Sequence, residues 1–207
     1  MAIKLKRIAI GMLAVLLFAA PITAYAQTDS YIVQKGDTLW KIAVKYKVGL
    51  SEIKAANPQI PDFDKIYPYD IVYVPLADRA TVGIEEEVLS LVNKERTSRG
   101  LHPLKLNWEL ARVARYKSED MRDRGYFSHT SPAYGTPFDM IRSFNIKMTA
   151  AGENIAKGYR TAQEVMIGWM NSPGHRANIL SGNFTEIGIG YCTGAGGPYW
   201  TQMFIRP

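Results

Sequence analysis

The clearest shortage in this 207-residue sequence is cysteine, which occurs once, at Cys192. A single cysteine cannot close an internal disulfide, so packing must stabilise the chain. Cys192 follows Gly190-Tyr191 in a strand-like run, which favours a buried thiol. An intermolecular cross-link is the alternative.

The sequence also lacks an apolar run typical of a membrane span at its amino terminus. The run over residues 8–20 is shorter than the ~20 residues that a spanning helix needs, and Pro21 follows it. Small residues at the two positions that a signal peptidase reads, Ala24 and Ala26, suit cleavage after Ala26. Three basic residues precede the run, namely Lys4, Lys6 and Arg7. We therefore predict a secretory signal peptide over residues 1–26, and no membrane anchor after its cleavage.

Positive charge is not clustered, although the formal net charge is +6. Removal of the predicted signal peptide takes away three basic residues and leaves 22 against 19 acidic ones. This spread excludes nucleic acid as the expected partner, since such binding depends on many phosphate contacts. A mildly basic protein suits anionic wall polymers.

Internal repeats and low-complexity tracts are also missing, and the chain divides into two different units. We expect a compact first unit over residues 31–75, a connector over 76–83 and a larger unit over 84–207. A hydrophobic content of 47% is sufficient for folded cores.

The first unit has the pattern of a strand, two helices and a closing strand. Residues 31–33 are β-prone, and apolar residues at helical spacing follow from Leu39 to Tyr46. Ser51 is a candidate cap for a second, short helix, and residues 70–75 alternate as a strand does. The predicted order is βααβ.

Three segments of this unit carry a specific pattern: YIVQKGDTLWKIA at 31–43, IKAANP at 53–58 and IVYVP at 71–75. Together they resemble the LysM carbohydrate-binding module. The resemblance implies recognition of N-acetylglucosamine-containing glycan, peptidoglycan or a chitin-like polymer, in a shallow groove between two loops. The residues that it places in the groove are Gly36, Asp37, Thr38, Asn57, Pro58, Gln59 and Ile60. Helix capping is the alternative role for Asp37 and Thr38. One departure is Tyr69, where the family often has glycine.

The larger unit has helical patterns first and strand patterns last. An amphipathic helix begins near Ile84, and its glutamates at 85–87 are expected to be partners of the helix dipole. Asn107 caps a second helix, and a capping box at 161–164 opens a third. The β-prone segments are 184–192 and 198–205. This order predicts an α+β fold.

Four polar residues lie in segments interrupted by glycine or proline: His129, Glu153, His175 and Glu186. Their spacing matches no local metal motif, so any site must be assembled from distant segments. From residue type alone, a structural role explains each histidine better than a role as a ligand does.

Five motifs surround these residues: FSHTSP at 127–132, GENIA at 152–156, WMNSPGHRANIL at 169–180, TEIGIGY at 185–191 and YWTQ at 199–202. They resemble the CAP domain of cysteine-rich secretory proteins, antigen 5 and pathogenesis-related proteins. The resemblance implies an α-β-α sandwich with a cleft where the four polar residues converge. It further implies that His129 and His175 bind a weakly held divalent metal such as zinc, and that Glu153 and Glu186 are the candidate catalytic groups.

The two resemblances together predict a secreted protein of the cell wall or spore envelope. We expect a binding or scaffold role in envelope or spore assembly, because no secure nucleophile and base pair is found. A metal-assisted hydrolase of wall or peptide bonds is one alternative. A carrier that holds a lipid in the CAP cleft is another. A protein partner bound in that cleft would fit the scaffold role.

Overall fold

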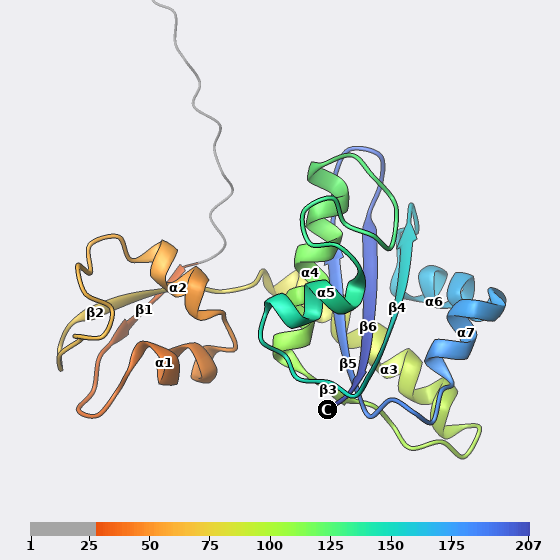
Figure 1. Cartoon of the computed structure of the whole chain (residues 1–207), viewed down its shortest axis with the longest axis horizontal. Helices are drawn as coiled ribbons and strands as arrows, with labels where there is room; N and C mark the ends of the chain where they lie inside the picture. The colour runs from red at the N-terminus through yellow and green to blue at the C-terminus, as the bar shows by residue number, and fades with distance from the viewer. Residues whose placement is uncertain (1–27) are drawn as a thin grey trace, which may run out of the picture.

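The computed structural model describes residues 28–207, and the predicted signal peptide over 1–26 lies outside this range. Two units follow each other along the chain, an amino-terminal module and a larger carboxy-terminal domain (Figure 1). Both mix helices and strands, which confirms the predicted α+β class. Among the described residues, no helix combines the length and apolar character needed to cross a membrane.

The amino-terminal module has the predicted βααβ order. Its elements are β1 (Thr28–Ile32), α1 (Leu39–Tyr46), α2 (Leu50–Ala56) and β2 (Ile71–Pro75). The strands pair antiparallel, from Thr28 opposite Pro75 to Ile32 opposite Ile71. Thr38 caps α1, since its side chain accepts the N–H of Lys41. The expected cap of α2 was wrong: Gly49 occupies the N-cap position, and Ser51 lies inside the helix.

A small core holds this module together. Its buried members are Val33, Leu39, Ile42, Ala43, Val48, Ile53, Val72 and Val74. The two inward residues of β2 belong to it, while Ile71 and Tyr73 alternate with them on the outer face. The outer face of the sheet therefore carries exposed apolar side chains.

The carboxy-terminal domain contains one four-stranded sheet within the described range, in the order β3-β5-β6-β4. Its elements are α3 (Arg79–Thr97), β3 (Lys105–Leu106), α4 (Trp108–Asp123), α5 (Pro137–Ser143), β4 (Ala150–Lys157), α6 (Ala162–Asn171), α7 (Pro173–Ile179), β5 (Glu186–Cys192) and β6 (Tyr199–Arg206). β3 runs parallel to β5, and the other neighbours are antiparallel.

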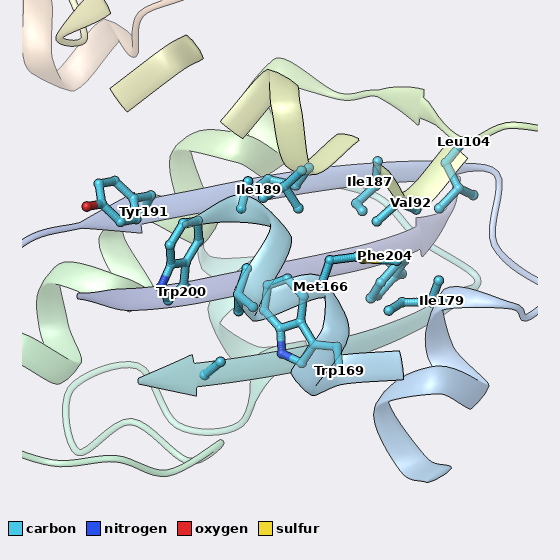
Figure 2. Close-up of a cluster of buried hydrophobic side chains, with 14 of the residues drawn as sticks. Val92, Leu104, Met166, Trp169, Ile179, Ile187, Ile189, Tyr191, Trp200 and Phe204 are labelled. Carbon is cyan, nitrogen blue, oxygen red and sulfur yellow. The ribbon is translucent and has the colours of Figure 1, made fainter. Parts of the chain in front are cut away.

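Helices cover both faces of this sheet, as the predicted α-β-α sandwich requires (Figure 1). On one face, α4 packs directly on β5. A Cβ added to Gly188 or Gly190 would lie within 2.5 Å of α4 backbone atoms, so this close approach requires glycine. On the other face, α3, α6 and α7 enclose the main core, where Trp169, Trp200 and Phe204 pack together (Figure 2).

Helix α3 starts earlier than expected. Asp78 caps it by accepting the N–H of Thr81, and the helix begins at Arg79, inside the expected connector. The expected role of Glu85 as a dipole partner was wrong. Glu85 is buried and accepts hydrogen bonds from both Arg115 and the N–H of Tyr191, so it ties α3 to α4 and β5.

One polar contact joins the two units. Glu52 of α2 accepts two hydrogen bonds from Nη2 of Arg112 in α4, at 2.6 and 2.8 Å. The Tyr116 hydroxyl, one turn further along α4, donates to the same carboxylate. Although burial works against ionisation, the hydrogen bonds from Tyr116 and Arg112 hold the pKa of Glu52 below its usual value. We call Glu52, Arg112 and Tyr116 the interdomain bracket.

Candidate functional site

The candidate site lies at β4, the strand at one end of the sheet order. Glu153 projects from β4 on the same face as its neighbours Ala151 and Ile155, whose side chains join the clusters beneath α4 and α5. Its side chain is 1% exposed, and Oε1 lies 2.7 Å from Nδ1 of His129. The imidazole of His129 is half exposed. The pair thus joins a buried carboxylate to an accessible ring.

The loop that carries His129 is fixed by polar residues of α4. Lys117 is buried, and its Nζ donates to the carbonyls of Ser128 and His129 at 2.8 and 2.9 Å. One turn later, Asp120 accepts a hydrogen bond from Oγ of Ser131 at 2.7 Å. These contacts hold both ends of the short segment that contains His129, so the ring is held in place by the helix.

His175 approaches the same region from α7. Asn154 of β4 donates to the carbonyl of His175, and Asn178 of α7 donates to Asn154 and to the carbonyl of Glu153. Two asparagine side chains therefore attach α7 to the strand that carries Glu153. His175 is near enough to His129 for their charges to interact.

The two histidines differ in their proton affinity. The hydrogen bond to Glu153 raises the pKa of His129 above its usual value. Burial, and then repulsion from His129, lower the pKa of His175. Near pH 6.5 the geometry therefore favours a protonated His129 beside a neutral His175.

Two buried polar atoms near this site have no hydrogen-bond partner among the described residues: Oε2 of Glu153 and Nε2 of Gln202. Gln202 is fully buried in β6, and its Oε1 accepts a hydrogen bond from Asn154. Leaving such atoms unpaired is costly. The second oxygen of Glu153 is thus a buried acceptor without a protein partner in the described range.

Glu186 does not join the other three predicted residues. In the sheet, Glu153 aligns with Gly188 across β6, and Glu186 is two residues further along β5. This offset separates the two backbones by about 10 Å across the strands and about 7 Å along them. Oε2 of Glu186 accepts a hydrogen bond from Asn107, the N-cap of α4. Of the four predicted residues, His129 and Glu153 are in contact and His175 lies near His129, whereas Glu186 is set apart from them.

The serines beside His129 make their contacts elsewhere. Ser131 is buried and donates to Asp120, and its Oγ also accepts the N–H groups of Ala133 and Tyr134. Oγ of Ser128 accepts the N–H of Thr130. Both hydroxyls thus stabilise the loop.

The residues predicted to bind glycan divide between two cavities beside the α2–β2 loop. Asp37 and Thr38 line one of 180 Å³, and Gln59 and Ile60 line another of 570 Å³. Thr38 caps α1, as the alternative interpretation held. Asp37 instead accepts hydrogen bonds from the Tyr31 hydroxyl and the N–H of Gln34, so it shapes the loop before the helix.

Gly36 and Pro58 are exposed, but Asn57 is not, which corrects its predicted role in the groove. The amide of Asn57 donates to the carbonyls of Ile53 and Tyr73 and accepts the N–H of Tyr73. Both side-chain polar atoms are therefore used in joining α2 to β2.

Comparison with known families agrees with this architecture. The model of the cysteine-rich secretory protein family, CAP, matches residues 89–204, more than half of the chain. The chain belongs to the CAP family. A LysM domain model matches residues 31–75, so the amino-terminal module is a LysM domain.

Three relatives illustrate the similarity of the LysM and CAP domains to known proteins. The uncharacterized protein YkwD of Bacillus subtilis is 54% identical over 129 residues, which are 62% of this chain and 49% of that protein. The crystal structure of an extracellular protein containing a SCP domain from Bacillus anthracis has a TM-score of 0.58 and 34% identity, covering 68% of this chain and 47% of that one. Spore coat assembly protein ExsA of Bacillus cereus is 51% identical over 45 residues, 22% of this chain and 7% of that protein. The chain spans about half the length of the first two.

The site formed by His129, Glu153 and His175 does not fit a stable metal centre. Within residues 28–207, no group of three or more His, Cys, Asp or Glu side chains is arranged to hold a metal ion. Nδ1 of His129 is engaged by Glu153, which leaves its Nε2 and the ring of His175 as donors. Two imidazoles are fewer ligands than zinc sites in proteins usually have.

Several residues that shape the CAP cleft were not foreseen, chief among them Lys117 and Asp120. A lysine and an aspartate three positions apart on a helix are typical of a solvated face, so the sequence gives no sign that they are buried. Cys192 is buried, as expected, and burial raises the pKa of its thiol to about 11.

Proposed function

We propose that this protein is a component of the cell wall or spore envelope that binds N-acetylglucosamine-containing glycan through its LysM domain. Its CAP domain then presents the cleft of His129, Glu153 and His175 in a binding or scaffold role. The LysM match supports glycan binding. The names of two relatives, one an extracellular protein and one a spore coat assembly protein, favour a secreted protein of the envelope.

One observation carries the scaffold role. The hydroxyl of Ser131 is turned to Asp120, and Ser128 caps its own loop, so neither serine is oriented by His129. An imidazole and a carboxylate without an oriented nucleophile lack the usual arrangement for covalent hydrolysis. The half-exposed imidazole of His129, held by Glu153, does offer a charged donor to a bound partner.

The test is a pull-down of the full-length protein on purified peptidoglycan, followed by mass spectrometry of the soluble fraction. Binding without released fragments is the expected result. Release of muropeptides by the wild-type protein, at a rate that Glu153→Gln reduces, would contradict the scaffold role. Ser128→Ala is the control, because that exposed side chain lies in the same loop.

A hydrolase is the second candidate, and the unpaired Oε2 of Glu153 favours it. A buried carboxylate with a free oxygen can take a proton from a water molecule, which is the minimum for general-base hydrolysis. In that case Glu153→Gln would lose activity while retaining its fold and its glycan binding.

We propose a weakly held divalent ion at His129 and His175, in keeping with only two donors. Titration calorimetry with zinc is expected to give weak binding that His129→Ala and His175→Ala each abolish. Tight binding that survives both substitutions would place the ion elsewhere.

A further inference from the structure

Tyr69 has a backbone conformation that disfavours its own side chain. Its φ is 79°, one of three positive φ values among non-glycine residues in the described range. It is the third residue of a turn from Tyr67 to Asp70, which the N–H of Asp70 closes on the carbonyl of Tyr67 at 3.0 Å. With Pro68 at the second position, this is the type II arrangement, which normally has glycine third.

The fold gains little from the tyrosine at this position. The Tyr69 side chain is 87% exposed and belongs to none of the buried clusters. The turn is fixed without it, because Asp70 accepts the N–H of Tyr67 and the backbone N–H of Tyr69 donates to Val33. Backbone strain retained without a packing benefit is typical of functional positions.

The ring of Tyr69 lines the 570 Å³ cavity, which is within the range of small-molecule pockets. Its main walls are Gln59, Ile60, Tyr67, Tyr69, Ile71 and Tyr73. We call this cavity the tyrosine groove. Tyr67 and Ile71 are more than half exposed, and Tyr73 is 44% exposed. The groove therefore offers accessible aromatic surface with hydroxyl groups at its edges.

The charged residues of the groove are already paired. Lys65 forms a salt bridge with Asp62 at 2.8 Å, and Asp70 accepts the N–H of Tyr67. A nearly neutral groove lined by amphipathic rings suits an uncharged ligand that has both apolar faces and hydroxyl groups. A pyranose ring has this character, whereas a strongly charged peptide does not.

We propose that the tyrosine groove is a sugar subsite in which Tyr69 stacks on a neutral N-acetylhexosamine ring. This inference rests on the proposed glycan binding and names a site for it. Gln59 and Ile60 belong both to this groove and to the predicted glycan loop, so a polymer bound at that loop continues onto the tyrosines.

The test is titration calorimetry of the full-length protein with the hexamer of N-acetylglucosamine. Tyr69→Gly is expected to weaken binding roughly threefold to tenfold through loss of the stacked ring. The same substitution should raise the melting temperature, by roughly 4 °C, because glycine relieves the positive φ. Opposite effects on affinity and stability separate a binding role from a structural one.

Lys47→Gly is the matched control. Lys47 also has a positive φ, of 55°, and is exposed in the same module, but it does not line the groove. It should likewise raise the melting temperature while leaving the affinity for the hexamer unchanged.

Three results would overturn the inference. The first is wild-type affinity for the hexamer in Tyr69→Gly, which would leave the proposed glycan binding intact. The second is a lower melting temperature of Tyr69→Gly, which would make the ring structural. The third is a dimer in sedimentation velocity that Tyr69→Gly dissociates, which would assign the groove to a second copy. If the wild-type protein binds neither the hexamer nor insoluble peptidoglycan, the proposed function itself fails.

Discussion

Ser131 illustrates how much of the CAP cleft is determined by single buried hydroxyl groups. Its Oγ donates to Asp120 and accepts two backbone N–H groups, from Ala133 and Tyr134. Ser128, three residues earlier, is exposed and accepts a single N–H. Both serines lie within two residues of His129 in the sequence, but only Ser131 is part of the interior.

Ser131→Ala is expected to lower the free energy of unfolding by about 2 kcal/mol, because the substitution removes the buried hydrogen bond to Asp120 and leaves the N–H groups of Ala133 and Tyr134 without their acceptor. Ser128→Ala should change it by less than about 0.5 kcal/mol. Urea denaturation of the full chain measures both values. Equal effects would show that the loop is not held by Asp120.

The pair of histidines should titrate in a fixed order. NMR titration is expected to find the pKa of His129 above 6.5 and that of His175 below it. Because the folded pKa of His129 is raised, its contribution to stability is fully present below pH 6.5 and is lost as the pH rises through that pKa. Glu153→Gln should remove this contribution and lower the pKa of His129. An unchanged pKa would contradict the contact.

At the scale of elements, the α2–β2 loop depends on one residue. Asn57 is fully buried and bonds to the end of α2, to Tyr73 of β2 and to Gln59. Asn57 thereby pairs the backbone N–H and carbonyl of Tyr73, which a third strand would pair in a larger sheet. The loop that forms the predicted glycan site is consequently rigid at its base.

Asn57→Ala is expected to destabilise the LysM domain by about 3 kcal/mol, since several buried hydrogen bonds are lost together. Gln59→Ala is the matched control, because Gln59 is exposed and loses only its bond to Asn57. Thermal unfolding followed by NMR signals of the module distinguishes the two. A small effect of Asn57→Ala on stability would contradict this structural role and favour the predicted role of Asn57 in ligand contact.

Local signals in the sequence predicted these elements better than they predicted the sites. The βααβ order and the caps Thr38 and Asn107 could be predicted, because they depend on residues a few positions apart. Glu186 and Asn57 could not, since their partners lie in other elements and become neighbours only in the folded chain. The same applies to Glu85, whose position near the start of a helix suggested solvent.

At the scale of the whole molecule, the interdomain bracket decides how the LysM and CAP domains are joined. Arg112 and Glu52 are largely buried, and a cavity of 190 Å³ beside them is lined by both domains. The pKa of the Glu52 carboxylate is lowered by its partners, so Glu52 is ionised at neutral pH and the bracket is formed. The bracket is lost only as the pH falls below about 4.5 and Glu52 takes up a proton.

Glu52→Ala is expected to release the two domains from each other without unfolding either. Small-angle scattering should then report a larger radius of gyration, and proteases should cut more rapidly near residues 76–78. Glu95→Ala, which removes the i,i+4 ion pair with Arg99 on the surface of α3, should leave both measurements unchanged. Identical scattering of Glu52→Ala and wild-type protein would contradict the role of the bracket.

While it is formed, the interdomain bracket has a geometric consequence. If a sugar strand is held by the first domain, the imidazole and carboxylate of the second can reach only material at one distance and direction from that strand. The spacing of neighbouring strands in the surrounding mesh would then select where this protein is able to act.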